Sequence, residues 1–140
     1  MEDFLRLESL VGEGDTIVLV GLNKKTIGMP KNALKIEKTE STEELRKIYS
    51  VADFYFNPSK EETMGMTTVE AIACGTIPVV YNLTALPEIA RILGGAVDKT
   101  NSPEGLISEV DNIKLPEIRM DALALFDKKT VFERYMRQYF

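Results

Sequence analysis

The sequence predicts an α/β protein built on a doubly wound parallel sheet. Strand-like and helix-like segments alternate along all 140 residues, and each strand-like segment is a continuous apolar run rather than an alternation of apolar and polar residues. Continuous apolar runs are typical of parallel strands that helices cover on both faces. No internal repeat, low-complexity segment or linker interrupts the pattern, so we expect a single domain over 1–140.

The N-terminal part of the chain predicts a helix and then a strand. Apolar residues recur at helical spacing in MEDFLRLESLV (1–11), which favours a helix. TIVLV (16–20) follows the turn-like sequence GEGD and is rich in β-branched residues, so it predicts a buried strand. The next segment, LNKKTIGMPKNALK (22–35), is basic and the most loop-like of the chain. Its Lys24 and Lys25 could contact a phosphate or simply lie in a solvated loop.

The middle of the chain predicts a helix with a clear start. In STEELRKIYSVA (41–52), Ser41 is followed three residues later by Glu44. This is the capping-box pattern, in which each side chain accepts a hydrogen bond from a backbone N–H that the helix leaves unpaired. The segment after it, DFYFNPS (53–59), predicts a strand and a turn that ends at Pro58.

Two further helix–strand pairs follow. TTVEAIACG (67–75) predicts a helix closed by Gly75, because glycine readily adopts the left-handed conformation that ends a helix. IPVVY (77–81) predicts another buried strand. The short helix PEIARIL is expected to start at Pro87, and the short strand GGAVD follows it.

The C-terminal part of the chain is predicted to be helical. In SPEGLISEVDNI, Ser102 is the expected N-cap and Pro103 the first helical residue. The tail, about 117–139, carries apolar and aromatic residues at intervals that favour a further helix.

Composition excludes several classes of protein. The net charge of −5 argues against nucleic acid as a partner, because phosphate backbones require an excess of Lys and Arg. The single cysteine, Cys74, excludes an intramolecular disulfide and fits a reducing compartment. No apolar run approaches the roughly 20 residues of a membrane-spanning helix, and the acidic N-terminus lacks the basic region of a secretory signal. We therefore expect a cytoplasmic protein, with peripheral membrane contact left open.

Functional residues are expected in the loops after the strands, because doubly wound sheets bind ligands outside the carboxyl ends of their strands. The loop 57–66 is the most informative of these. Gly65 allows the backbone to approach a ligand closely, and the helix behind it offers unpaired N–H groups that favour a phosphate. Glu70 could return to the same pocket and accept hydrogen bonds from two ribose hydroxyls. Glu62 could lie near a sugar or a departing group.

Purely structural roles for these residues remain open at this point. Thr67 and Glu70 also fit a capping box, so Glu70 could cap its own helix. Glu62 could serve only to keep the loop soluble. The chain contains no His and no metal-ligand cluster, so no metal site is expected.

A longer motif spans this region. The passage YSVADFYFNPSKEETMGMTTVEAIACGTIPVVYNLTALPEI resembles the C-terminal domain of GT-B glycosyltransferases of family 4, the group 1 retaining transferases. In that family a strand ending in Pro-Ser leads to Glu-x-Phe-Gly, then to Leu-Glu-Ala-x-Ala-x-Gly, Pro-Val-Val and Pro-Glu. The matching residues here are Pro58, Ser59, Glu62, Met64, Gly65, Val69, Glu70, Ala71, Ala73, Gly75, Pro78, Val79, Val80, Pro87 and Glu88.

The resemblance implies a Rossmann-like domain that binds the nucleotide of a sugar-nucleotide donor. It implies that Glu70 holds the ribose hydroxyls, that Glu62 faces the donor sugar near the bond that breaks, and that Met64 lies beside the donor. The amides of Gly65, Met66 and Thr67 would meet the diphosphate. The base would lie near 36–39, which makes Lys38 a further candidate substrate-binding residue. Such enzymes retain the anomeric configuration, use no bound metal for the diphosphate, and commonly act in surface polysaccharide synthesis.

The chain also departs from the family pattern. Met64 replaces a phenylalanine, and Thr84 and Ala85 stand where the family often has two glycines. Family members carry an Arg and a Lys for the diphosphate just before the helix that begins here near Glu2. We therefore expect the 140 residues to be part of a longer enzyme whose N-terminal acceptor-binding domain is the partner of this one. A non-catalytic nucleotide-sugar-binding module and a GT-B sugar-nucleotide epimerase are the alternatives.

Overall fold

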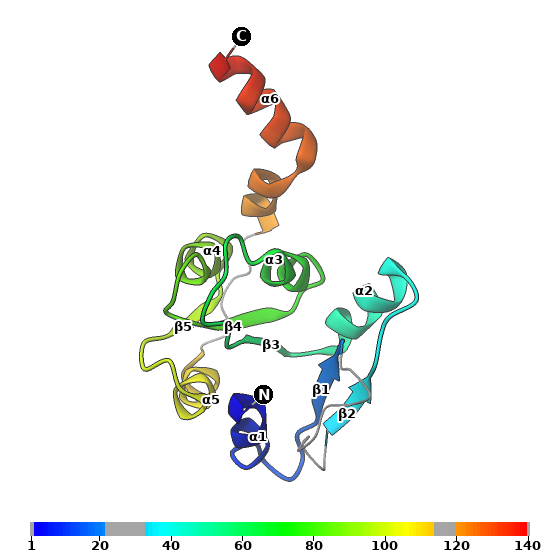
Figure 1. Cartoon of the computed structure of the whole chain (residues 1–140), viewed down its shortest axis with the longest axis vertical. Helices are drawn as coiled ribbons and strands as arrows, with labels where there is room; N and C mark the ends of the chain where they lie inside the picture. The colour runs from blue at the N-terminus through cyan, green and yellow to red at the C-terminus, as the bar shows by residue number, and fades with distance from the viewer. Residues whose placement is uncertain (1, 22–32, 114–119, 140) are drawn as a thin grey trace.

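A computed structural model describes residues 2–21, 33–113 and 120–139, and its elements alternate as the sequence predicts (Figure 1). The α-helices are α1 (Glu2–Glu8), α2 (Thr42–Val51), α3 (Met66–Ala73), α4 (Leu86–Leu93), α5 (Pro103–Asn112) and α6 (Lys128–Tyr139), and η1 (Met120–Phe126) is a 3-10 helix. The strands are β1 (Ile17–Val20), β2 (Ala33–Ile36), β3 (Phe54–Asn57), β4 (Ile77–Tyr81) and β5 (Ala96–Asp98).

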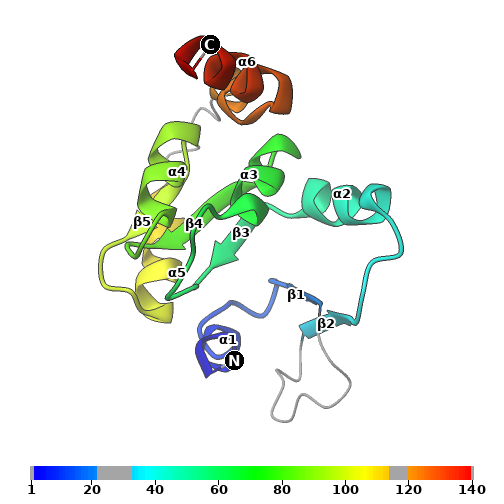
Figure 2. The same cartoon turned by 45° about the horizontal axis from the view of Figure 1, so that its top comes forward.

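The strands form two parallel sheets. β1 pairs with β2, and β3, β4 and β5 form a three-stranded sheet in that order. Figure 2 shows the two sheets as separate units. The α/β fold class with parallel strands and helices between them is therefore confirmed, but the strands of the described residues do not join into one continuous sheet.

Helices cover both faces of the three-stranded sheet, as a doubly wound arrangement requires (Figure 1). On one face, Val80 of β4 packs with Leu86 and Ala90 of α4. On the other face, Val79 and Tyr81 of β4 pack in one cluster with residues of α5 and α1. Because every residue of β4 is buried, the strand has a continuous apolar sequence.

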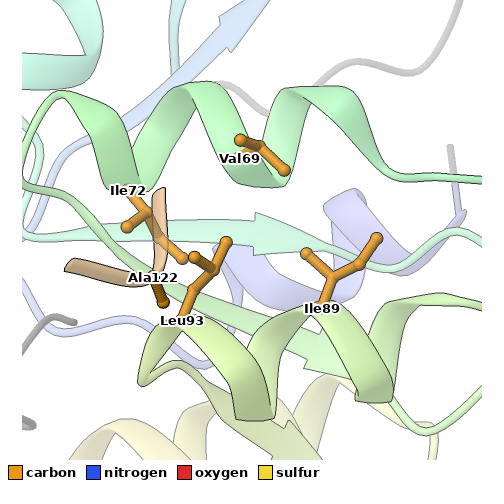
Figure 3. Close-up of a cluster of buried hydrophobic side chains, with 5 residues drawn as sticks. All are labelled: Val69, Ile72, Ile89, Leu93 and Ala122. Atoms are coloured by element: carbon orange, nitrogen blue, oxygen red, sulfur yellow. The ribbon is translucent and has the colours of Figure 1, made fainter. Parts of the chain in front are cut away.

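A further apolar cluster lies between α3 and α4 (Figure 3). Val69 and Ile72 of α3 meet Ile89 and Leu93 of α4, and Ala122 of η1 packs against them. The cluster holds α3 against α4 and η1. The first turn of α3 lies at the carboxyl edge of the sheet, because the helix follows the end of β3.

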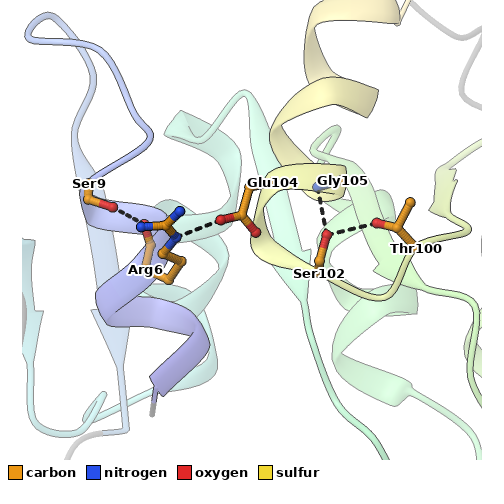
Figure 4. Close-up of polar contacts among 6 residues, drawn as sticks. All are labelled: Arg6, Ser9, Thr100, Ser102, Glu104 and Gly105. Atoms are coloured by element: carbon orange, nitrogen blue, oxygen red, sulfur yellow. Dashed lines mark hydrogen bonds and ion pairs between the residues drawn. The ribbon is translucent and has the colours of Figure 1, made fainter.

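The predicted helix ends are largely observed. The Ser41 hydroxyl accepts a hydrogen bond from the Glu44 amide, and the Glu44 carboxylate accepts one from the Glu40 amide rather than from that of Ser41. Ser102 caps α5 by accepting from the Gly105 amide (Figure 4). Figure 4 also shows the ion pair between Arg6 of α1 and Glu104 of α5, which joins these two helices on one face of the sheet.

Three boundaries differ from the prediction. Ala33–Ile36 forms β2, so the end of the segment expected to be a loop is a strand. The sequence does not predict this short strand because Lys35 interrupts its apolar run, and pairing with β1 decides its conformation. The helix expected to start at Pro87 begins at Leu86, with the proline in its first turn. The tail is a 3-10 helix followed by an α-helix, and 22–32 and 117–119 lie outside the described residues.

Candidate functional site

The turn after β3 is fixed to the start of α3 by a buried asparagine. Asn57 is the last residue of β3, and its side chain is buried. Its Oδ1 accepts a hydrogen bond from the Ser59 amide (3.2 Å), and its Nδ2 donates to the Thr68 hydroxyl (3.2 Å). One side chain thus forms hydrogen bonds to both the turn and the helix. These bonds fix the position at which the loop 58–65 leaves the sheet.

Gly65 starts α3 in a conformation that favours glycine. It is the N-cap, with φ of 62° and ψ of 44°, and a Cβ there would lie 3.1 Å from Leu86 Cδ2. Gly65 offers no capping side chain, and within the described part of the chain nothing accepts a hydrogen bond from the amides of Met66 and Thr67. The helix N-terminus therefore presents unpaired donors at the carboxyl edge of β3.

The capping-box interpretation of Thr67 and Glu70 is wrong. Thr67 lies inside the first turn of α3, and its hydroxyl accepts a hydrogen bond from the Tyr55 hydroxyl (2.8 Å). Glu70 is exposed on the same helix. Because Gly65 is the N-cap, neither the Thr67 nor the Glu70 side chain caps the helix.

The two predicted carboxylates both act electrostatically on one tyrosine, Tyr55, that the sequence does not single out. Burial raises the pKa of Tyr55 above its ordinary value, the hydrogen bond to Thr67 lowers it, and the negative charges of Glu62 and Glu70 raise it again. Both glutamates therefore lie within electrostatic reach of one phenol group. The ring of Tyr55 is itself held edge-on to Tyr49 of α2, with centroids 5.7 Å apart.

Glu62 is half-buried and fixed within its loop. Its carboxylate accepts a hydrogen bond from the Thr63 amide (3.1 Å), and its own amide donates to the Thr84 hydroxyl (3.2 Å). The Thr84 hydroxyl in turn donates to the Leu83 carbonyl (2.8 Å). Thr84 therefore links the loop after β3 to the loop after β4.

Thr84 adopts a backbone conformation that is unfavourable for a residue with a side chain. Its φ is +53°, in the left-handed region where glycine is preferred. We expect Thr84→Gly to be more stable than Thr84→Ala by about 1 kcal/mol, because both variants lose the hydroxyl but only glycine removes the strain. Chemical denaturation of the two variants measures the difference, and equal stabilities would contradict the strain.

A pocket of about 250 Å³ lies between the start of α1 and the end of β3. Asp3 and Phe4 of α1 form one wall, and the run from Tyr55 to Ser59 forms the other. Tyr55 therefore lines this pocket, and its hydroxyl also donates a hydrogen bond to Thr67 at the start of α3. No local sequence pattern indicates this role of Tyr55, because the hydrogen bond joins a strand residue to a residue of the next helix.

The other predicted residues lie at varying distances from this edge. Met64 and Met66 are each 47% exposed on either side of Gly65. Lys38 is exposed in the segment after β2, which belongs to the other sheet. Lys24 and Lys25 lie outside the described residues.

The described ranges contain neither a cluster of metal-ligating side chains nor a membrane-spanning helix. Within 2–21, 33–113 and 120–139, no three His, Cys, Asp or Glu side chains gather in a way that could hold a metal ion. None of the helices in those ranges combines the length and the apolar character needed to cross a membrane.

Residues 24–124 match the model of a protein family described as glycosyl transferases group 1. The match covers the loop 58–65, α3 and both predicted glutamates.

The chain is also similar to individual proteins. A GDP-mannose:cellobiosyl-diphosphopolyprenol alpha-mannosyltransferase from Xanthomonas oryzae pv. oryzae is 28% identical over 115 residues, which is 78% of this chain and 28% of that protein. A D-inositol 3-phosphate glycosyltransferase from Segniliparus rotundus is 31% identical over 81 residues, 57% of this chain and 18% of that protein. One of the same name from a Mycobacterium species (strain KMS) is 39% identical over 61 residues, 42% of this chain and 14% of that protein. The chain therefore spans less than a third of these relatives.

Proposed function

The chain belongs to the glycosyl transferases group 1 family, and from this premise we propose that the start of α3 and the loop before it bind the nucleoside diphosphate of a sugar donor. The observation that carries the proposal is the glycine-started helix, whose first amides have no acceptor among the described residues. A diphosphate would accept hydrogen bonds from these amides and would lie at the positive end of the helix dipole.

The amides of Gly65, Met66 and Thr67 are the groups assigned to the diphosphate. Gly65 is needed at the bend because its φ of +62° favours glycine, and because a Cβ would crowd Leu86. Amides held by a helix start need no reorganisation when the anion binds, so they act as a preorganised anion site. We propose that they neutralise the diphosphate without a bound metal.

The two glutamates are assigned different roles in the same site. Glu70 is exposed on α3 and would accept hydrogen bonds from the ribose hydroxyls, since an ionised carboxylate is an acceptor only. Glu62 is held in its loop by the Thr63 amide and by Thr84, so its position is fixed before a donor binds. We assign Glu62 to the donor sugar, near the bond that breaks. Met64 would pack against the donor, and Lys38 is assigned to the base.

The whole enzyme is proposed to be a hexosyltransferase that passes the donor sugar to an acceptor with retention of configuration. One relative is named as using GDP-mannose, which supports a nucleoside diphosphate sugar as the donor class. Because the chain spans 28% of that relative, the acceptor site is assigned to a further domain of a longer polypeptide. We propose a cytoplasmic reaction in surface polysaccharide synthesis, with contact at the inner membrane left open.

Titration of the ¹⁵N-labelled chain with UDP, GDP and ADP tests the binding site. We expect the amide signals of Gly65, Met66 and Thr67 to shift with at least one of the three nucleotides, and those of α5 to stay in place. The diphosphate lies next to the first three amides, so their shifts should saturate together. Titration with the matching nucleoside, which lacks the diphosphate, is the control. If all three nucleotides leave these amides unchanged, the proposed site is wrong.

A further inference from the structure

The backbone at Thr84 has a conformation that a threonine side chain disfavours. Of the residues that the structure describes, two other than glycine have a positive φ, Thr84 at +53° and Asn101 at +54°. Asparagine adopts this left-handed conformation more often than most residues do, whereas a β-branched residue is rarely found there. Asn101 therefore suits its backbone, and Thr84 does not.

The Thr84 hydroxyl uses both its proton and its oxygen in hydrogen bonds. It donates to the Leu83 carbonyl (2.8 Å) and accepts from the Glu62 amide (3.2 Å). Because a hydroxyl carries one proton, the bond to Leu83 fixes its orientation and leaves the oxygen free to accept from Glu62. The side chain of Thr84 therefore holds the backbone of Glu62, in the loop after β3, against the loop after β4.

Stability of the fold does not explain why threonine stands at this position. Thr84 is exposed and Glu62 is half-buried, so water can replace the hydrogen bond between them when the hydroxyl is removed. The strain of a β-branched residue at positive φ offsets what that bond contributes. Strained backbone conformations of this kind cluster at binding and catalytic sites. The hydrogen bond to Glu62 therefore indicates a role in placing the loop.

The loop that Thr84 holds is attached to the start of α4 at two points. At one point, the Glu62 amide donates to Thr84, directly before α4. At the other, Gly65 lies so close to Leu86, the first residue of α4, that a Cβ on Gly65 would be 3.1 Å from Leu86 Cδ2. Between these points, the Thr63 amide donates to the Glu62 carboxylate (3.1 Å). Together these contacts fix the Glu62 carboxylate before a ligand binds.

We propose that Thr84 is a positioning residue for the sugar of the donor. This role of Thr84 rests on the proposed function, which assigns Glu62 to the sugar near the bond that breaks. Thr84 acts through Glu62: its hydroxyl fixes the Glu62 backbone at the distance from the start of α3 that a sugar attached to the diphosphate requires. The amides assigned to the diphosphate belong to the helix start itself, so they do not depend on the Thr84 hydroxyl.

The affinities of the 140-residue chain for a nucleotide sugar and for the matching nucleoside diphosphate together test this role. The probes are GDP-mannose with GDP, UDP-glucose with UDP, and ADP-glucose with ADP, and calorimetric titration measures each dissociation constant. We expect Thr84→Gly to weaken binding of the nucleotide sugar about fivefold, the contribution of one hydrogen bond. Binding of its nucleoside diphosphate should change by less than about twofold. A substitution that only disturbed the fold would weaken both.

Two variants serve as controls for Thr84→Gly. Thr84→Ser keeps the hydroxyl, so it should keep the parent ratio of the two affinities. Asn101→Gly is the matched control, because Asn101 also has a positive φ and its side chain also joins two loops by accepting a hydrogen bond from the Asn82 amide (2.7 Å). That bond does not involve Glu62, so Asn101→Gly should leave the ratio unchanged.

A double substitution tests whether Thr84 acts through Glu62. In a chain that already carries Glu62→Gln, adding Thr84→Gly should change the affinity for the nucleotide sugar by less than about twofold, because the two residues act as one unit. An equal loss from Thr84→Gly with and without Glu62→Gln would overturn the proposal. It would also be overturned if Thr84→Gly bound the nucleotide sugar as tightly as the parent chain, or lost both ligands to the same extent.

Failure of this role is distinguishable from failure of the proposed function. If the parent chain binds none of the three nucleoside diphosphates, the proposed function is wrong, and so is the role of Thr84. If a nucleoside diphosphate shifts the amides of Gly65, Met66 and Thr67 but Thr84→Gly leaves binding of the nucleotide sugar unchanged, only the role of Thr84 is wrong.

Discussion

Replacing Glu70 by glutamine is expected to lower the affinity of the chain for a nucleoside diphosphate by about tenfold to a hundredfold. An ionised carboxylate that accepts hydrogen bonds from a ribose diol contributes roughly 1.5–3 kcal/mol, which corresponds to that range. Glutamine keeps the shape of the side chain but removes the charge and replaces one acceptor with a donor. Glu70 is exposed, so the substitution should leave the stability of the fold within about 0.5 kcal/mol.

Calorimetric titration with the nucleotide that gives the strongest amide shifts measures this loss. Glu133→Gln is the matched control, because Glu133 is an exposed glutamate on α6 and has no assigned role at the site. Binding of the matching free base should be unaffected by Glu70→Gln, since the base carries no ribose. If the Glu70→Gln variant binds as tightly as the parent chain, Glu70 is not part of the nucleotide site. The assignment of the diphosphate to the amides at the start of α3 would not be affected by that result.

Asp98→Ala is expected to destabilise the fold by about 3 kcal/mol, the largest effect among the substitutions discussed. Asp98 ends β5 and is 1% exposed. Its carboxylate accepts hydrogen bonds from the amide and hydroxyl of Thr100 (both 2.7 Å) and from the Ser102 amide (2.8 Å). Removing one acceptor that serves three donors leaves partly buried polar groups without partners.

The same network fixes the start of α5. Ser102 and Thr100 are also joined through their hydroxyls (2.8 Å; Figure 4). A Cβ added to Gly105 would collide with Thr100 and Asp98. Thermal unfolding should show a fall of about 10 °C for Asp98→Ala in a chain of this size. Asp111→Ala is the control, because Asp111 is exposed near the end of the same helix. Equal melting temperatures for the two variants would show that the network contributes little.

Structural features that depend on interactions within a few residues can be predicted from the sequence. The caps at Ser41 and Ser102 join a side chain to an amide three residues later, so the spacing alone identifies them. The buried strand Ile77–Tyr81 is predictable because helices cover both faces of its sheet, which requires an apolar residue at nearly every position. The positive φ of Gly65, at 62°, likewise agrees with the choice of glycine at that bend.

Structural features that depend on contacts between residues distant in the sequence cannot be predicted in this way. β2 has too few residues and too mixed a sequence to be recognised, and pairing with β1 decides its conformation. The sequence does not indicate Tyr55, because its hydrogen bond to Thr67 joins a strand to the following helix. The Glu62–Thr84 contact joins residues 22 apart in the chain, from two different loops.

The amino-acid sequence by itself determined the alternation of helices and strands and the helix caps at Ser41 and Ser102. These features depend on local hydrogen bonding and on the apolar period of each segment. Only the tertiary structure decided that both glutamates act electrostatically on Tyr55, that Thr84 holds the Glu62 loop, and that the strands of the described residues form two sheets. Those features require chain segments that are distant in sequence to meet, and the free energy of such packing is shared among residues that no local pattern connects.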